Sequence, residues 1–329
     1  MPTSSGSTLP PLTGPIAAVH TPLDSDGRVA TGVVQRHAAH LRGAGVGAVY
    51  VCGSTGESLA LTASERATML EAWLAAFAAK SDVATGDVAT GGANGLVLAH
   101  VGANALPEAR ELARHAGQSG AHAISAMHPT FGRARTLEAI VAHHARIAEM
   151  APDTPYIVYE LAGTGAPVFP ASALVAEAAR RIPTFAGIKY TSGDLLELGL
   201  ALELAEAGGQ QLFFGTDEHL LAGLALGCRA AIGSTYSYAP SLGRAVFDAF
   251  AAGDLPRART AQRRLARLVR PLLRHGVLRT GKFLLETAGV PVGAPRSPET
   301  ALDADERAAV LAEVMPLGIA EFAHAGAAR

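Results

Sequence analysis

Short runs of apolar and β-branched residues recur along the chain, and each is followed by a longer stretch whose apolar positions repeat with a helical period. The apolar runs predict strands at 15–22, 47–53, 96–103, 121–129, 155–160, 185–191, 211–217 and 230–235. The stretches between them predict helices at 30–43, 63–80, 106–119, 136–150, 171–181, 194–207, 218–227 and 240–252. Strands that alternate with helices indicate parallel pairing, and near-continuous apolar strands indicate burial on both faces.

Eight strand–helix units in about 240 residues match the size of a (β/α)8 TIM barrel, so we predict an α/β fold of this kind over residues 12–252. A doubly wound open sheet is the structural alternative. It usually has fewer strands and a glycine-rich phosphate loop after the first strand, and the first unit here, "VHTPLDSDG", lacks that loop.

The two ends of the chain and one internal segment depart from this alternation. Residues 1–11 are rich in Ser, Thr, Gly and Pro and are predicted to form a flexible tail. Residues 253–329 carry helical patterns only, at 254–275, 279–289 and 299–316, and are predicted to form a helical appendage packed on the barrel. The segment 81–95, "SDVATGDVATGGANG", is glycine-rich and weakly patterned, which predicts an inserted surface loop.

Cap signals support several of these helices. "LTASER" places Thr62 or Ser64 at the start of the helix predicted at 63–80, and "TSGDLLEL" places Ser192 before the helix predicted at 194–207.

Composition excludes several classes of protein. The net charge of -2 provides no basic surface for nucleic acid. No apolar run approaches the roughly 18 residues that cross a bilayer, and the first residues have neither the basic nor the apolar part of a signal peptide. Only Cys52 and Cys228 are present, so no disulfide framework is expected and a reducing cytoplasm is predicted.

Lysine is scarce: of 27 basic residues only Lys80, Lys189 and Lys282 are lysines. Lys189 lies in the apolar run "GIKYT", near the end of the sixth predicted strand, where a barrel carries its active site. If its side chain points inward, burial disfavours the charged form, and a neutral amine is the nucleophile that attacks a carbonyl to form a Schiff base. The alternative is a lysine that extends to solvent or pairs with a carboxylate.

Two further groups are placed to act with Lys189. Tyr159 ends the fifth predicted strand, so it shares the barrel mouth with Lys189 and can transfer a proton or stabilise developing charge. The alternative is a packed aromatic ring with a satisfied hydroxyl. In "VCGSTGES", at the end of the second strand, backbone N–H groups and the hydroxyls of Ser54 and Thr55 can converge on a carboxylate, although Gly/Ser turns are common.

Together, "VCGSTGESLALT", "LVLAHVGANALPEARELA", "GIKYTSGDL", "FFGTDE" and "AAIGSTY" closely resemble the N-acetylneuraminate lyase and dihydrodipicolinate synthase family, over roughly residues 12 to 295. These are pyruvate-dependent class I aldolases on a (β/α)8 barrel. Within the family the motifs are most similar to the lyase branch. The resemblance implies a lyase that acts on a 2-oxo acid without a metal or cofactor, with pyruvate and a sugar aldehyde as its small-molecule partners, in a homotetramer.

The resemblance also implies roles for individual residues. Lys189 matches the Schiff-base lysine and Tyr159 the catalytic tyrosine, while Ser54 and Thr55 match the pair that binds the pyruvoyl carboxylate. The positions that match contacts to the sugar or its polyhydroxyl tail are Thr191, Gly215, Asp217, Glu218 and Ser234. Adjacent carboxylates accept bonds from vicinal hydroxyls well, but they also occur where a helix N-terminus attracts negative charge.

The segment after Tyr159, "YELAGTGAP", departs from the family pattern of tyrosine, polar residue, apolar residue and proline. Ala162 stands where the proline is usual, and Glu160 is an unusual neighbour. These changes leave open a related aldolase or dehydratase that acts on another 2-oxo sugar acid. A more distant alternative is a non-catalytic ligand-binding barrel, which would not need both Lys189 and Tyr159.

Other signals were weaker. "HPTFGRA" contains no tyrosine of the kind that the synthase branch carries after strand four, and its His128 is predicted either to contact substrate or to be a packed or surface histidine.

"GVLRTGKF" is close to a phosphate-binding loop, but Phe283 replaces the required Ser/Thr and no strand precedes it. We therefore predict that Lys282 anchors the C-terminal helices. His143 and His144 are adjacent rather than spaced as zinc ligands on a helix.

Overall fold

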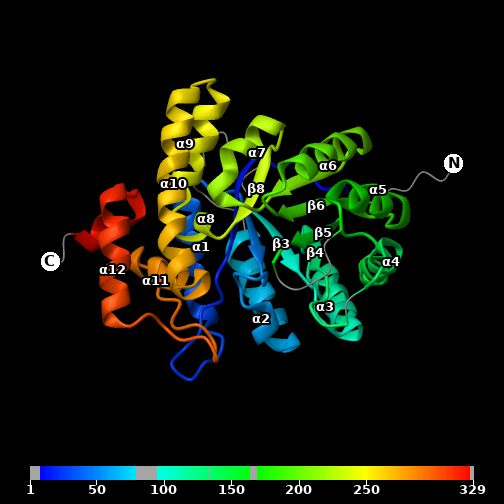
Figure 1. Ribbon diagram of the computed structural model, residues 1–329. Helices are drawn as coiled ribbons and strands as arrows, with labels where there is room; N and C mark the ends of the chain where they lie inside the picture. The colour runs from blue at the N-terminus through cyan, green and yellow to red at the C-terminus, as the bar shows by residue number, and fades with distance from the viewer. Residues whose placement is uncertain (1–7, 79–94, 133, 164–168, 327–329) are drawn as a thin grey trace.

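The computed structural model describes residues 8–78, 95–132, 134–163 and 169–326. Within these ranges parallel strands close into a barrel in which each strand pairs with the next along the chain and the last pairs with the first (Figure 1). The strands are β1 Gly14–Ala18, β2 Ala48–Val51, β3 Leu96–His100, β4 Ala123–Met127, β5 Tyr156–Leu161, β6 Phe185–Thr191, β7 Gln211–Phe214 and β8 Ala230–Gly233. The predicted (β/α)8 barrel is confirmed, and the open sheet is excluded.

Helices follow the strands in the predicted order. They are α1 Val34–Gly43, α2 Ala63–Trp73, α3 Leu106–Gln118, α4 Leu137–Ala148, α5 Ala171–Arg181, α6 Leu195–Gly208, α7 Leu220–Leu226 and α9 Pro240–Ala251. The boundaries are less regular than predicted. Short 3-10 turns precede α1 and α7, at Thr31–Val33 and Asp217–His219, and a π-helical turn follows α2 at Leu74–Ala78. The short helix α8, Thr235–Tyr238, was not predicted.

The structure confirms one of the predicted helix caps and contradicts another. Thr62 caps α2 and forms a reciprocal capping box with Glu65, as its position predicted. The prediction for α6 was wrong: Asp194 caps this helix and accepts bonds from the backbone N–H groups of Leu196 and Glu197, both at 3.1 Å. Ser192 instead accepts a bond from the N–H of Asp194 and so shapes the turn before the cap.

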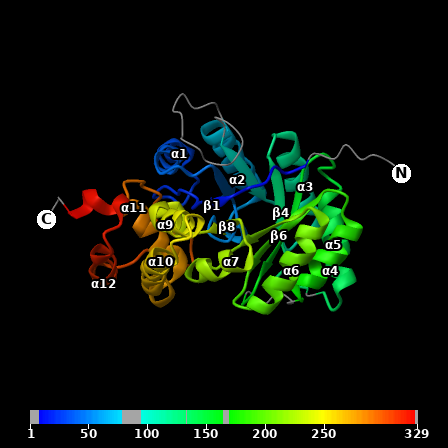
Figure 2. The ribbon, with the colours of Figure 1, turned by 90° about the horizontal axis from the view of Figure 1, so that it is seen from above.

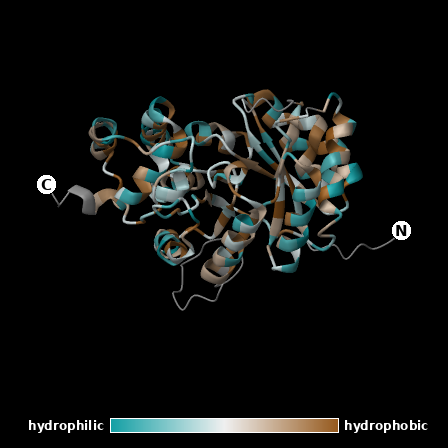
Figure 3. Cartoon of the chain, turned by 90° about the horizontal axis from the view of Figure 1, so that it is seen from below, coloured by the Kyte–Doolittle hydropathy of each residue, from teal (hydrophilic) through white to brown (hydrophobic). Residues whose placement is uncertain are grey.

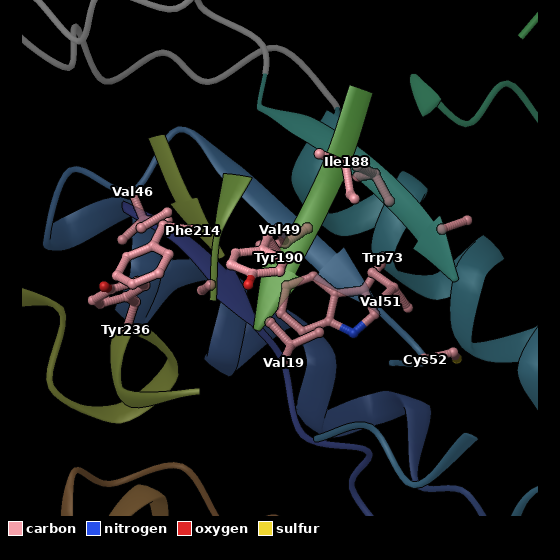
Figure 4. Packing of buried hydrophobic residues seen from close by; sticks show 14 of the residues in the cluster. Val19, Val46, Val49, Val51, Cys52, Trp73, Ile188, Tyr190, Phe214 and Tyr236 are labelled. Carbon is pink, nitrogen blue, oxygen red and sulfur yellow. The ribbon is translucent and has the colours of Figure 1, made fainter. Parts of the chain in front are cut away.

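The strands separate two buried layers of side chains. Along each strand, alternate side chains point into the barrel interior, where Tyr50, Ile157 and Tyr159 lie. The side chains between them pack against the surrounding helices. Figure 4 shows part of this outer layer, with Trp73 of α2 near Val51. The helices carry both hydrophobic and hydrophilic positions (Figure 3), as expected for helices with one face on the strands.

The C-terminal helices lie together on one side of the barrel, beside α9 (Figures 1 and 2). They are α10 Leu255–His275, α11 Val277–Thr287 and α12 Ala304–Val314. Helix α10 packs against α9 and the 3-10 turn at Asp217–His219, and α11 packs against α8. The last helix starts later than predicted because Asp303 forms its cap.

Some predictions concern residues that the structure does not describe. Of the loop predicted at 81–95, only Gly95 lies within the described residues, and of the predicted tail at 1–11 only residues 8–11 do. None of the described helices is long and apolar enough to span a membrane.

Candidate active site

Lys189 and Tyr159 face each other across the β5–β6 ladder. Tyr159 pairs with Lys189 in the strand register, and both side chains point into the barrel, where they are 3% and 5% exposed respectively. The Nζ atom of Lys189 lies 4.0 Å from the centroid of the Tyr159 ring. The two residues that the sequence predicted to share the barrel mouth are therefore in contact. No carboxylate of the described residues lies within ion-pair distance of the amine.

A second aromatic ring, which the sequence reasoning missed, borders the amine. Tyr50 of β2 is fully buried, and its ring centroid lies 4.4 Å from the Nζ atom of Lys189. The rings of Tyr50 and Tyr159 meet edge to face, with centroids 6.1 Å apart, and the Tyr50 hydroxyl donates to Ser125 Oγ at 3.0 Å. The faces of aromatic rings attract cations, so these two rings suit an ammonium or an iminium ion at this position. Period-2 alternation on strand 47–53 would have placed Tyr50 inside the barrel.

His100 of β3 completes the aromatic surroundings as a neutral ring. Its centroid lies 6.1 Å from those of Tyr50 and Tyr159. Its Nδ1–H donates to the Cys52 carbonyl at 3.0 Å, and its Nε2 accepts from the Met127 N–H at 3.1 Å. Burial, followed by the nearby positive charges of Arg66 and Lys189, holds the pKa of His100 well below 6.5. A neutral imidazole adds no repulsive charge beside Lys189.

The side chain of Lys189 lines a cavity of about 410 Å³ at the carboxyl ends of the strands. The predicted site residues that line it are Thr55, Tyr159, Lys189, Thr191, Gly215, Asp217, Glu218 and Ser234. Ser54 is exposed and does not line the cavity. Leu161 and Ala162 form part of the wall from the end of β5, and Val269, Leu272 and Leu273 contribute from α10. A cavity of this size accommodates a small sugar acid.

Asp217 is the buried carboxyl group of this cavity. Its Oδ2 accepts a bond from the hydroxyl of Thr235 at 2.6 Å and another from the Thr235 N–H at 3.1 Å. Its Oδ1 has no hydrogen-bond partner among the described residues. Burial raises the pKa of Asp217 to about 6, against the bonds from Thr235. Gly233 makes room for this carboxyl group, because a Cβ there would overlap it.

The neighbouring sugar-site positions are tightly packed. Gly215 lies against Thr191, so that a Cβ at Gly215 would overlap the Thr191 Oγ1, an atom that has no partner among the described residues. Gln262 of α10 donates to the backbone carbonyl groups of Asp217 and Glu218, at 3.2 and 2.8 Å. The C-terminal helices thus hold the 3-10 turn that presents these two carboxylates.

The turn after β2 is held from both sides. Thr21 Oγ1 donates to the Gly56 carbonyl at 2.7 Å. Glu57 has a left-handed backbone, with φ of 60°, and its buried carboxylate forms a 2.6 Å ion pair with Lys282 of α11. This pair anchors α11 to the barrel and confirms the predicted role of Lys282. The same turn presents Thr55 to the cavity.

His128 and Glu160 do not line the cavity, although His128 directly follows β4 and Glu160 lies near the end of β5. Both are buried, and His128 Nε2 lies 2.7 Å from Glu160 Oε2 on the outer side of β5. The structure therefore supports the packed alternative for His128. The described residues contain no group of three or more His, Cys, Asp or Glu arranged to hold a metal ion.

Three comparisons with known proteins bear on this site. The sequence model of the dihydrodipicolinate synthetase family matches residues 11–315. The chain is 32% identical over 290 residues to N-acetylneuraminate lyase of Mus musculus, which is 87% of each chain. Among solved structures, N-acetylneuraminate lyase of Proteus mirabilis is 31% identical with a TM-score of 0.85, over 94% of this chain and 99% of that one. The Aliivibrio salmonicida enzyme, N-acetylneuraminate lyase or sialic acid aldolase, is also 31% identical with a TM-score of 0.85, over 94% and 97%.

Proposed function

Because this chain is a lyase that belongs to the dihydrodipicolinate synthetase family, we propose that it is a Schiff-base aldolase that interconverts N-acetylneuraminate with N-acetylmannosamine and pyruvate. One observation carries the proposal. The buried amine of Lys189 opens into a cavity of about 410 Å³, lies beside the ring of Tyr159, and has no carboxylate partner within the described ranges. An unpaired buried amine at a barrel mouth is suited to attack a carbonyl.

In this mechanism the neutral amine of Lys189 attacks the C2 ketone, and loss of water gives a protonated imine. The iminium withdraws electrons from C3. The C4 hydroxyl then loses its proton to the relay formed by Tyr159 and the substrate carboxylate, and the C3–C4 bond breaks. Its electron pair forms the enamine of pyruvate, which is protonated at C3 and hydrolysed to release pyruvate and free Lys189.

The remaining site residues divide between the two ends of the substrate. Ser54 and Thr55 bind the carboxylate, while the residues that hold the hydroxyl groups are Thr191, Gly215, Asp217, Glu218 and Ser234. Every one of these except Ser54 lines the cavity, which supports the assignment. Among the described residues, Thr191 Oγ1 and Asp217 Oδ1 have no hydrogen-bond partner, and they are packed against Gly215 and Gly233.

The second candidate keeps the Schiff base but changes the sugar acid or the reaction to a dehydration. Its specific support is the cavity wall at Leu161 and Ala162, which belongs to the segment that departs from the family pattern. Leu161 and Ala162 follow Tyr159 along the chain, whereas Lys189 lies on β6, so a change at this wall is proposed to alter which aldehyde fits more than the capture of pyruvate.

We also propose that residues 253–329 complete the barrel rather than form a separate domain. Side chains of α10 line the cavity, and Lys282 of α11 pairs with Glu57 after β2.

A homotetramer is proposed on the exposed leucines of α6. Leu196, Leu200 and Leu204 recur every fourth residue and are 73%, 42% and 43% exposed, which leaves an apolar stripe for a second copy of the chain. A cytoplasmic location is consistent with the free, buried Cys52 and Cys228.

Reductive trapping tests the proposal directly. The protein is incubated with pyruvate and borohydride, and the adduct is located by mass spectrometry of peptides. The adduct is expected on Lys189 and not on Lys282, and pyruvate release from N-acetylneuraminate is expected from the untreated enzyme. Absence of any adduct would favour a non-catalytic binding barrel, and an adduct without cleavage would favour the second candidate.

A further inference from the structure

A continuous chain of buried polar side chains runs along the outer face of β5, on the side opposite the cavity. Glu160 Oε2 contacts His128 Nε2, His128 Nδ1 contacts His144 Nε2, and His144 Nδ1 contacts the Tyr156 hydroxyl, each at 2.7 Å. All four side chains are buried. The chain joins the two ends of β5 to α4 and to the residue that follows β4.

The protons of this chain can be placed in one consistent direction. The Tyr156 hydroxyl donates to His144, the Nε2–H of His144 donates to His128, and the Nε2–H of His128 donates to the Glu160 carboxylate. Burial holds the pKa of His144 well below 6.5 and raises the pKa of Tyr156 well above 10, so both remain neutral. Every bond then has one donor and one acceptor, and Glu160 Oε2 is the last acceptor of the chain.

Stability alone does not account for a buried carboxylate at this position. Replacing buried ionic groups by apolar residues of similar volume is often neutral or stabilising, whereas a fully satisfied polar chain fixes geometry. Glu160 lies between Tyr159, whose ring contacts the Lys189 amine, and Leu161, which lines the cavity. The bond to His128 therefore restrains the stretch of β5 that carries Tyr159 and the cavity wall.

We propose that Glu160 is a positioning residue: held by His128, it fixes the carboxyl end of β5 so that Tyr159 keeps its place beside Lys189. This role depends on the proposed function and extends it to a residue outside the cavity. The Lys189 amine is carried by β6 and Thr55 by the turn after β2, and none of the three bonds of the chain involves either element. Loss of the restraint should thus impair C–C cleavage more than the capture of pyruvate.

The test compares Glu160→Leu, Glu160→Gln and Tyr156→Phe, each measured for cleavage kinetics and for borohydride trapping with pyruvate. For Glu160→Leu, kcat for cleavage is expected to fall on the order of 10²-fold, with trapping at the wild-type level, since a small displacement of a catalytic group is costly. In Glu160→Gln the amide oxygen accepts the same bond from His128, so kcat should stay within about tenfold of wild type. Tyr156→Phe removes the bond farthest from Tyr159 and is the matched control: it should lower thermal stability but leave kcat near wild type.

The double variant Glu160→Leu/His128→Phe removes the His128 donor that Glu160→Leu leaves unpaired, and it should lose cleavage as Glu160→Leu does if that single variant does not fold. The positioning role is overturned if the Glu160→Leu and Tyr156→Phe enzymes have equal kcat, or if cleavage and trapping fall together. Failure of the wild-type protein to form an adduct would instead overturn the proposed function, so the two outcomes are distinguishable.

Discussion

Two of the three lysines of this chain are buried in the described structure, and their surroundings differ. Lys282 of α11 lies 2.6 Å from the Glu57 carboxylate and donates to the Ala294 carbonyl at 2.9 Å. Lys189 of β6 faces the rings of Tyr159 and Tyr50 and has no ion-pair partner among the described residues. The two side chains are buried to nearly the same extent, at 2% and 5% exposed.

The difference separates a structural lysine from the lysine that we propose as the nucleophile. Burial lowers the pKa of Lys282 from its usual value, while the neighbouring charge of Glu57 opposes this shift and the pair holds α11 against the turn after β2. The Nζ atom of Lys189 lies against ring faces instead, and its side chain lines the cavity. Burial by itself therefore does not distinguish the two lysines; the absence of a counter-ion beside a cavity does, and it is the reason to propose Lys189 as the nucleophile.

The largest effect is expected from Lys189→Ala. Removal of the proposed covalent nucleophile should lower kcat/KM for N-acetylneuraminate cleavage on the order of 10⁴-fold or more. The fold should persist, because Lys189 makes no ion pair in the described structure that the change would break. Steady-state pyruvate release and thermal unfolding together measure the two expectations. Activity near wild type would refute the role of Lys189.

Lys282→Met should lower the stability of the fold and leave the reaction of Lys189 with pyruvate intact. It leaves the buried Glu57 carboxylate without its partner, and breaking a buried pair costs about 3–5 kcal/mol in the free energy of unfolding. Urea denaturation measures this loss, and trapping with pyruvate should still label Lys189. The double variant Lys282→Met/Glu57→Gln removes the unpaired charge and should recover much of the stability. Equal stability of the single variant and wild type would contradict a structural role for Lys282.

Tyr159→Phe tests the contribution of the Tyr159 hydroxyl separately from that of Lys189. The ring that faces the Lys189 amine is retained. The hydroxyl that we propose to relay the C4 proton is lost. Cleavage should slow by about 10²- to 10³-fold, while trapping with pyruvate falls less. Rapid-quench measurement of adduct formation beside steady-state kcat distinguishes the steps. Greater loss of trapping than of cleavage would count against the proton relay.

Part of this comparison was predictable from the sequence. The alternation in "GIKYT" and the end of the fifth strand sufficed to bring Lys189 and Tyr159 together, because neighbouring parallel strands end at the same edge. The contact between Tyr50 and Lys189 was harder to predict, because Tyr50 approaches Lys189 across the barrel from β2 and the contact depends on how the sheet closes. The pairing of Glu57 with Lys282, and of His128 with Glu160, depends on side-chain packing between distant elements, which periodicity does not encode.

Tyr50 tests whether ring faces replace the counter-ion that Lys189 lacks. Tyr50→Leu removes the face that lies 4.4 Å from the amine, which is worth about 1–2 kcal/mol for a desolvated cation. The cationic iminium loses this stabilisation, so the concentration of pyruvate that gives half-maximal trapping should rise about tenfold. Tyr50→Phe keeps the ring and loses only the bond to Ser125, and is expected to stay close to wild type. Equal behaviour of the two variants would show that the ring face is unimportant.

The smallest effect is expected from the titration of Asp217, the buried carboxyl group that shares the cavity with Lys189 but bonds to Thr235 instead. Burial raises its pKa to about 6, so it is ionised above that pH and protonated below it. If the carboxylate accepts bonds from substrate hydroxyls, KM for N-acetylneuraminate should rise by up to about tenfold as pH falls from about 8 to about 5. Asp217→Asn, which cannot ionise, should have a raised KM that lacks this pH-dependent step. A wild-type KM that is flat across the range would mean that Asp217 stabilises the turn through Thr235 and leaves the hydroxyls to Glu218 and Thr191.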